Sequence, residues 1–222
     1  DSLNLDVESR KVVGRLSRFY TFLININDAI IRIHEKDELL SEICRISVED
    51  GGFLYARISL IDESGEPSTA ADFGPNPDEK LILTREKRFT IAATKVVDSG
   101  EFLVLNAPIE FDHLIAPETD LESTCKSFAS FPIKNGGPAI GAFGLSSEET
   151  ECFGPIEIKL IEQVAHNVMY ALQSIDNEEK RTFAEKLLME SQERYADLYE
   201  NSPDMLLSVD PSTARVIRCN AT

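Results

Sequence analysis

The sequence of 222 residues contains no tryptophan, only three histidines and only four cysteines. The cysteines are widely spaced and form no Cys-x-x-Cys pair, so the sequence shows neither a zinc-site pattern nor a disulfide framework. No apolar run approaches the roughly 20 residues that a membrane-spanning helix needs. The first residues, DSLNLDVESRKVV, lack the basic and then apolar layout of a signal peptide. These absences favour a reduced cytoplasmic protein without membrane insertion in this segment.

Basic residues are also scarce. The chain has 22 lysines and arginines against 39 aspartates and glutamates, which gives a net charge of −17. Such a surface repels nucleic acid and the anionic face of a membrane, so we exclude nucleic acid as a partner. Hydrophobic residues make up 42% of the chain, and the length suits one full domain with a smaller addition.

An apolar stripe with strict heptad spacing runs through the first 34 residues. Its members recur at alternating steps of four and three residues: Val12, Leu16, Phe19, Leu23, Ile26, Ile30 and Ile33. The spacing predicts one long helix, and further apolar residues outside the stripe give it more apolar surface than one partner covers. Either core packing or a dimer seam explains the stripe. We expect a parallel homodimer, with an interface formed by Leu16, Phe19, Leu23, Ile26, Ile30 and Ile33.

The next hundred residues alternate between helical and strand-like patterns. A short helix is expected from Asp37 to the Gly51-Gly52 pair. FLYARISLID and STAADFG are expected to pair as two strands, because both are rich in strand-forming or small residues and a turn sequence joins them. TREKRFTIAATKVVDSG is expected to be helical, and EFLVLN a short strand. The segment 107–123 is expected to be a long loop.

The stretch FPIKNGGPAIGAFGL contains four glycines. It lacks the Gly-Lys pair of a phosphate-binding loop and the glycine spacing of a dinucleotide site. Asn135-Gly136 lies between two apolar runs, which predicts a β-hairpin with strands over 129–134 and 139–146. Two glycines would then lie inside the second strand, where they allow a helix or a ligand to approach closely: Gly141 and Gly144.

A second long helix is expected from Pro155, a favourable first-turn residue. Its apolar periodicity fades over 176–181, returns weakly, and ends near Pro203. MLLSVD and ARVIRCN then read as two short strands.

These segments resemble a GAF domain followed by the start of a PAS domain. INDAIIRIHEKDELLSEICRISVEDGGFLYARISLID, SFASFPIKNGGPAIGAFGLSSEE and FGPIEIKLIEQVAHNVMYAL carry the first resemblance, and YADLYENSPDMLLSVDPSTARVIRCNAT carries the second. The resemblance implies an α+β fold, in which helices flank a central antiparallel sheet and both terminal helices are long. It divides the chain into an N-terminal helix (1–34), a GAF domain (35–176), a connecting signalling helix (177–200) and the truncated start of a PAS domain (201–222).

The resemblance also implies a sensory module of a prokaryotic signal-transduction protein, of the histidine kinase (two-component) or diguanylate cyclase type. Such a module binds a small ligand and relays the signal through its terminal helices to a downstream output domain. The cofactor or ligand is unknown from the sequence. By resemblance, the ligand-binding residues are Phe89, Ala93, Asn106, Phe111 and Ser127. The alternative is a ligand-free spacer that serves dimerisation alone.

The histidines offer no clear chemical site. A phospho-acceptor histidine is followed by an acid, then by arginine and proline, whereas Asn167 follows His166. We therefore expect His166 to pack on the long C-terminal helix. His113 has neither a partner histidine nor suitably spaced acids, so we expect it at the surface and predict no metal or haem site.

The sequence matches the signatures of two ligand classes of GAF domains only poorly. A bilin-attachment cysteine is followed by histidine, whereas Lys126 follows Cys125, so we expect no bilin. The cyclic-nucleotide signature pairs asparagine with lysine, whereas Ala107 follows Asn106, which leaves that ligand without support.

Catalysis is the third hypothesis, because a few GAF-like domains reduce methionine sulfoxide through cysteines. That chemistry needs clustered thiols, and only Cys125 and Cys152 are candidates. No Ser-His-Asp or Cys-His arrangement is recognisable, and the acids are typical of a solvated surface. We therefore expect no catalytic residues and no enzymatic activity.

Overall fold

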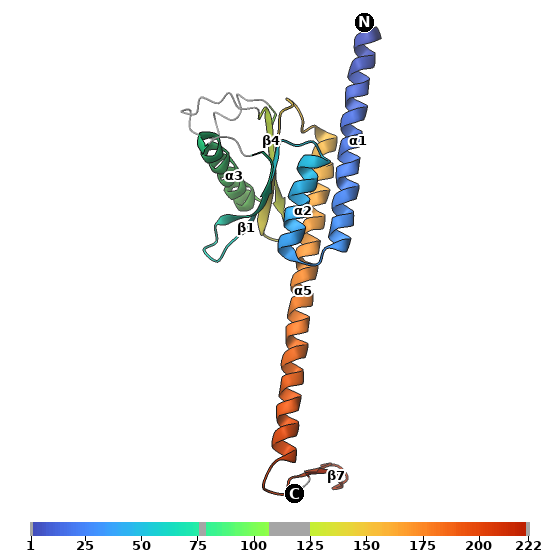
Figure 1. Cartoon of the computed structure of the whole chain (residues 1–222), viewed down its shortest axis with the longest axis vertical. Coiled ribbons are helices and arrows are strands. Elements are labelled where there is room, and N and C mark those ends of the chain that lie inside the picture. Colours follow the sequence, from blue (N-terminus) through green and yellow to red (C-terminus); the bar gives the residue numbers. More distant parts are fainter. Residues whose placement is uncertain (1, 76–78, 107–124, 221–222) are drawn as a thin grey trace. The chain divides into compact units, whose positions relative to one another are not determined.

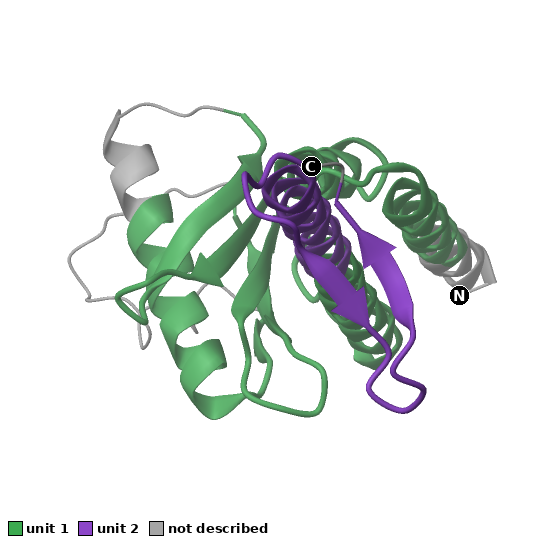
Figure 2. Ribbon diagram, turned by 90° about the horizontal axis from the view of Figure 1, so that it is seen from below, with its two compact units in different colours: residues 1–175 green, residues 176–222 purple. Residues whose placement is uncertain are grey.

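The computed structural model describes residues 2–75, 79–106 and 125–220 (Figure 1). It has the mixed α+β fold that the sequence predicts, and it divides into two compact units, Asp1–Ile175 and Asp176–Thr222 (Figure 2). Within the described residues, the first unit contains a five-stranded antiparallel sheet in the order β2-β1-β5-β4-β3. No helix among these residues has both the length and the hydropathy to cross a membrane.

The elements follow the expected order. The helices are α1 (Ser2–Arg32), α2 (Lys36–Glu49), α3 (Glu79–Ser99) and α5 (Pro155–Glu200). The strands of the first unit are β1 (Tyr55–Ile61), β2 (Pro67–Phe73), β3 (Leu103–Leu105), β4 (Ser127–Ile133) and β5 (Gly141–Ser147). The paired strands of FLYARISLID and STAADFG, the α3 helix and the short β3 strand are all confirmed. The predicted loop over 107–123 lies outside the described residues.

Helices cover both faces of the sheet (Figure 1). α3 lies on one face, and α2 with the first part of α5 and α1 lies on the other. The main core fills the space between the sheet and this second helical layer, and its largest fully buried side chains include Phe22, Phe131, Phe143 and Phe153. The helical layer therefore supplies most of the apolar burial that stabilises the domain.

The β4–β5 hairpin is confirmed, with Ile133 opposite Gly141. The connection spans residues 134–140, whereas the predicted strands leave 135–138 between them. Gly136 has a positive φ of 68°, whereas Asn135 does not adopt the left-handed region. Only Gly136 therefore supplies the conformation that a type I′ turn would require of both residues.

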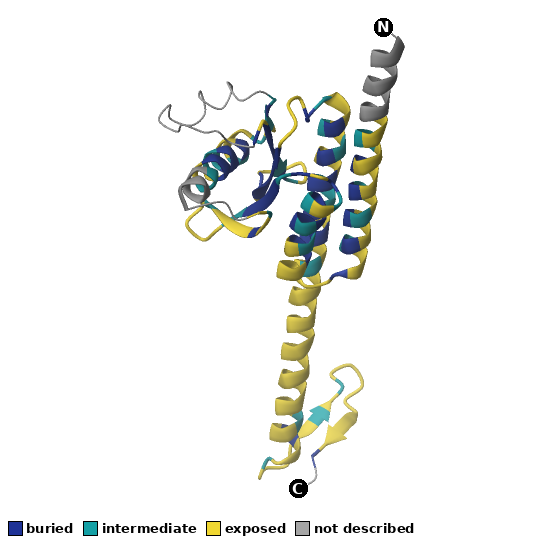
Figure 3. Cartoon of the chain, turned by 45° about the horizontal axis from the view of Figure 1, so that its top comes forward, coloured by how far each residue is buried: buried dark blue, intermediate teal, exposed yellow. Residues whose placement is uncertain are grey.

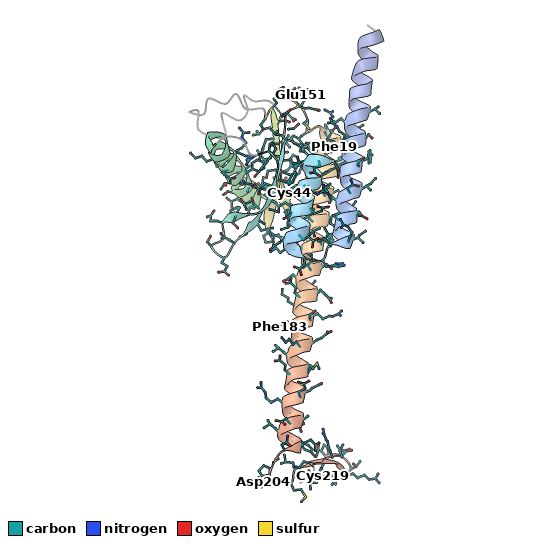
Figure 4. The ribbon with its side chains drawn as sticks, in the orientation of Figure 1. Phe19, Cys44, Glu151, Phe183, Asp204 and Cys219 are labelled. Atoms are coloured by element: carbon teal, nitrogen blue, oxygen red, sulfur yellow. The ribbon has the colours of Figure 1, made fainter. Side chains whose placement is uncertain are left out.

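The stripe predicted as a dimer seam faces the core of its own chain. Phe19 (labelled in Figure 4), Ile26 and Ile33 are buried there. The ring centroids of Phe19 and Phe53 are 5.5 Å apart. The other predicted seam residues with described side chains are partly buried: Leu16, Leu23 and Ile30. Heptad spacing identifies an apolar helix face but not the chain that covers it, so the buried residues have no free surface to offer a second copy.

α1 also carries a second apolar stripe, on the exposed part of its surface that is yellow in Figure 3. Its members are exposed and follow one another at steps of seven, four and seven residues: Val13, Tyr20, Ile24 and Ile31. At 100° per residue, the mean direction of this stripe lies about 110° around the helix from that of the stripe predicted as the seam. The two stripes give α1 one face for its own core and another that remains exposed.

The second unit comprises the C-terminal part of α5 and a hairpin of β6 (Leu207–Val209) and β7 (Val216–Cys219), which confirms the two short strands expected there. Asn220 is buried, accepts a 2.8 Å hydrogen bond from the Leu206 backbone N–H and donates a 2.9 Å bond to the Asp204 carbonyl. Within this unit, the α5 side chains are exposed except at Ala196 and Tyr199, and Phe183 is one example (Figure 4).

Candidate functional site

The two faces of the sheet differ in composition. Because strand side chains alternate between faces, Ala56, Ile58, Phe143 and Leu145 point into the helical core. The opposite face, which we call the α3 face, is mixed and largely polar. In register it presents Tyr55, Arg57 and Ser59 from β1, Ser146, Gly144 and Ala142 from β5, and Phe128 and Ser130 from β4.

α3 packs directly against the middle of this face. A Cβ on Gly144 would lie 2.7 Å from the Phe89 ring, so the strand needs glycine there for the helix to approach. Phe89 also makes edge-to-face contacts with Tyr55 and Phe128, at 5.2 and 4.9 Å between ring centroids. The sequence prediction that Gly144 permits close approach is thus confirmed, with α3 as the neighbour.

A buried ion-pair network lies beside Phe89. The Arg57 side chain is 2% exposed and donates to both carboxylate oxygens of Glu86, to one of them at 2.7 Å. It also donates to the Tyr55 hydroxyl at 3.1 Å and lies 3.8 Å from Asp72. Burial by itself lowers the Arg57 pKa, but the bond to Glu86 makes the net shift upward. Arg57 therefore stays charged and joins β1, β2 and α3.

Tyr55 donates its hydroxyl proton to Asp72. Burial raises the pKa of this hydroxyl to about 12, and the bond to Asp72 adds to the rise. Tyr55 is therefore neutral at ordinary pH and acts as a donor to the carboxylate.

Two further arginines reach this end of the α3 face from successive turns of α3. The Arg85 guanidinium lies 3.8 Å from the centroid of the Tyr55 ring, and its Nη1 donates a 2.8 Å bond to the Pro75 carbonyl. Arg88 is 5% exposed and interacts with the Cys125 thiol, as does the Ser146 side chain. Tyr55 and Ser146 are opposite one another across β1 and β5, so both arginines lie over the same row of the sheet.

Burial governs the chemistry of the cysteines. It raises the pKa of Cys44 to about 12 and also raises that of Cys152. Burial raises the pKa of Cys125 as well, although the positive charge of Arg88 opposes the shift. All three side chains are therefore thiols rather than thiolates at neutral pH.

The five predicted ligand residues do not form one group in the structure. Phe89 and Ala93 lie on α3 against the sheet, whereas Phe111 lies outside the described residues. Asn106 donates a 3.0 Å bond to the Phe153 carbonyl and accepts a 3.1 Å bond from its N–H. Ser127 donates to the Glu149 carbonyl at 2.7 Å, and its β4 neighbour Phe128 is the one on the α3 face.

Asn106 and Ser127 thus fasten the segment between β5 and α5, and Ser127 points away from the α3 face. For Phe89 and Ala93, ligand contact stays a prediction. The sequence analysis missed Tyr55, Arg57, Arg85 and Arg88. An arginine inside the strand YARISLI and two arginines three residues apart in TREKRF were the available signals.

The histidines and metal-binding side chains add little to the site. The His166 ring packs edge-on against Tyr170 on α5, with centroids 4.7 Å apart. In the described ranges, no group of three or more His, Cys, Asp or Glu side chains is arranged to hold a metal ion. His113 lies outside those ranges.

Comparison with known proteins settles the family. A model of the GAF domain matches residues 34–173. The chain belongs to the GAF domain family. GAF domains are commonly regulatory. No curated protein sequence matches the chain.

Solved structures share the GAF fold at low sequence identity. The free methionine-R-sulfoxide reductase of Neisseria meningitidis, solved with its substrate, has a TM-score of 0.57 at 15% identity, covering 72% of this chain and 90% of that one. The GAF domain of a phosphoenolpyruvate-protein phosphotransferase from Coxiella burnetii has a TM-score of 0.57 at 14% identity, covering 74% and 98%. The GAF domain of Nlh2 from A. aeolicus, in an inactive state, has a TM-score of 0.54 at 17% identity, covering 72% and 98%.

The first of these neighbours corrects one expectation. We predicted that the chain is not an enzyme, and that exclusion is wrong because an enzyme shares the fold over most of its length. At this identity the likeness establishes the fold and no activity. Catalysis therefore stays open to this chain, and a direct assay must decide it.

Proposed function

We propose that this chain is a regulatory module of a cytoplasmic prokaryotic signal-transduction protein, and that it binds a small molecule at the α3 face. The observation that carries the proposal is the buried polar content of this face: Arg57, Ser59, Arg88, Ser130 and Ser146 are all buried. Burying polar groups costs free energy that a purely structural layer avoids, as the opposite face does with its apolar side chains. Ligand sites combine such polar anchors with apolar walls.

Native mass spectrometry of the purified chain tests ligand binding. We expect a retained compound that is released on denaturation, and we expect Ser146→Leu to abolish retention by filling the face. A matched control is Ser191→Leu, an exposed position of α5 in the second unit. If wild type and both variants carry no compound, the alternative of a ligand-free spacer is favoured.

Free methionine-R-sulfoxide belongs among the compounds offered to the protein, because a structural neighbour is named for its reduction. Its consumption with dithiothreitol as reductant, by wild type and by Cys125→Ser and Cys152→Ser, measures catalysis separately from binding. Thiol-dependent turnover would make the chain an enzyme as well as a binding module.

We also propose a parallel homodimer through the exposed α1 stripe, defined above as Val13, Tyr20, Ile24 and Ile31. The members of this stripe recur at heptad-compatible steps, although the intervening heptad positions are the polar Ser17 and Asn27. Exposed apolar side chains in this arrangement favour packing against a second helix. α1 is joined to α5 within the chain by Arg15 and Glu157, 3.1 Å apart, and by a 2.8 Å bond from Asn167 to Asn27. A change at the dimer interface therefore has a physical route to α5.

Light scattering tests the dimer. Ile24→Glu places a charge on the stripe and is expected to yield a folded monomer, whereas Thr21→Glu adds the same charge to an exposed position off the stripe and is expected to leave a dimer. A monomeric wild type would refute the proposal. So would a folded Ile24→Glu variant that remains dimeric.

In this proposal the divisions of the chain have separate roles. Residues 1–34 serve dimerisation, 35–176 form the sensory domain, 177–200 act as the connecting helix, and 201–222 begin a PAS domain that leads to an output domain. A bound ligand would bias the packing of α1 and α5 and so alter the connecting helix. The output would be a histidine kinase or a diguanylate cyclase.

A further inference from the structure

The α3 face concentrates positive charge in a chain whose net charge is −17. Three arginines meet there, from β1 and from α3: Arg57, Arg85 and Arg88. The two nearby carboxylates, Glu86 and Asp72, are engaged by Arg57 and Tyr55. Arg57 is thus neutralised within the fold.

Arg85 differs from Arg57 because no carboxylate among the described residues lies within salt-bridge distance of it. Its guanidinium is held by the Tyr55 ring and by the Pro75 carbonyl, and its Nε–H is buried without an acceptor in the described part of the chain. A buried donor without an acceptor destabilises the folded state. An anion that accepts from Arg85 would remove this cost and balance its charge.

Arg88 lies three residues further along α3, on the same side of the helix, and interacts with Cys125 beside Ser146. Tyr55, whose ring lies beneath Arg85, is paired with Ser146 on the neighbouring strand. Arg85 therefore lies over β1, and Arg88 lies near β5 beside it. Directly opposite residues on antiparallel strands have Cα atoms about 4.5–5.5 Å apart. Two planar guanidinium groups over the same row of the sheet suit the oxygens of one carboxylate or phosphate group.

We propose that the α3 face binds a small organic anion through its carboxylate or phosphate group, with Arg85 and Arg88 as the binding residues and the Tyr55 ring as the support of Arg85. The proposal rests on the proposed function and adds the chemical class of the ligand. The acidic remainder of the chain repels a polyanion such as nucleic acid, so a small molecule is favoured. The neighbouring apolar cluster of Phe89, Leu105 and Phe128 suits an organic body rather than a bare inorganic ion.

Thermal unfolding with charged and neutral probes tests the inference. The probes are sodium benzoate, phenyl phosphate and neutral benzamide, each titrated at constant ionic strength set with sodium chloride. Benzoate or phenyl phosphate is expected to raise the melting temperature of wild type saturably, because a ligand that binds the folded state stabilises it. Benzamide, which matches benzoate in shape without its charge, is expected to have no such effect. The stronger of the two anions identifies the headgroup.

Two substitutions on α3 provide the matched comparison. Arg85→Gln is expected to weaken the apparent affinity for the anion by about tenfold or more, since it removes a charge-assisted hydrogen bond. Lys87→Gln removes the same charge from an exposed position of the same helix and is expected to bind like wild type. Arg88→Lys keeps the charge but loses the planar fork, and is expected to weaken binding as well.

Three outcomes overturn the inference: neither anion stabilises the protein, benzamide stabilises it as much as benzoate, or Arg85→Gln and Arg88→Lys both bind like wild type. Native mass spectrometry separates this failure from failure of the proposed function. A neutral compound retained by the purified chain would refute the anion proposal and still support a ligand-binding module. Retention of no compound, together with no probe effect, would oppose both.

Discussion

The two faces of the central sheet differ in polarity, so that residues next to one another in a strand have opposite character. On β4, Phe131 is fully buried in the apolar helical core, and the adjacent Ser130 is buried on the α3 face. On β1, Ile58 enters the same core, and the adjacent Arg57 is held in an ion-pair network. One face is packed to stabilise the domain, whereas the other keeps polar groups at an energetic cost. This difference between the faces is what the proposed ligand binding at the α3 face would require.

The largest expected effect contrasts the faces within one strand. Phe131→Ala should lower the free energy of unfolding by about 3–5 kcal/mol, because it removes a fully buried ring and leaves a cavity. Ser130→Ala should change it by no more than about 1 kcal/mol, since only a hydroxyl is lost. Urea unfolding of both variants measures the difference. Equal losses would show that the α3 face stabilises the domain as much as the helical face does.

The second prediction concerns how closely α3 approaches the sheet. Gly144→Ala places a Cβ against the Phe89 ring and should destabilise the domain by about 1–3 kcal/mol through overpacking. Phe89→Leu in the same chain should recover part of this loss, because the smaller side chain relieves the contact. A double variant that shows only the sum of the two single losses would mean that the helix and the strand do not meet there.

The third prediction uses the raised pKa of Tyr55. A tyrosine whose pKa rises on folding stabilises the folded state fully below pH about 10. That contribution is lost as the pH rises through the folded value of about 12. Between these pH values, wild type should lose about 1–2 kcal/mol more stability than Tyr55→Phe, which cannot ionise there.

Urea unfolding at several pH values measures the two slopes, and Tyr170→Phe, at an exposed position, is the control that should follow wild type. The background ionisation of lysines is common to all three proteins and cancels in the comparison. Parallel curves for wild type and Tyr55→Phe would contradict the network of Tyr55, Asp72 and Arg57.

Local sequence patterns predicted most elements of the fold, because the spacing of apolar residues indicates helices and the turn residues indicate hairpins. The partners of those elements were harder to predict. The α1 stripe from Leu16 to Ile33 has coiled-coil spacing, yet its own chain buries half of it. Ser127 was assigned to the ligand site, but the neighbouring Phe128 is the residue on the α3 face, because a shift of one residue reverses the side of a strand.

The arginines of the candidate site were missed for a related reason. Arg85 and Arg88 lie among other charged residues in TREKRF, and only the tertiary arrangement of α3 over Tyr55 and Cys125 distinguishes them from solvated side chains. Sequence spacing places both on one side of a helix but gives no sign of which side meets the sheet.

The smallest expected effect lies in the loop that joins β4 to β5, the two strands at the centre of both faces. Gly136 and Gly137 are adjacent, and an added Cβ would meet no atom within 4 Å at either position. Only Gly136 has a positive φ, of 68°. Gly136→Ala should therefore destabilise the domain by about 1 kcal/mol, because an L side chain is strained in that conformation. Gly137→Ala should be neutral or slightly stabilising, since it restricts only the unfolded chain. Thermal unfolding of the pair isolates backbone conformation from packing. Equal melting temperatures for the two variants would mean that Gly136 is not the left-handed residue of the turn. Another residue would then have to fix the register of β4 and β5.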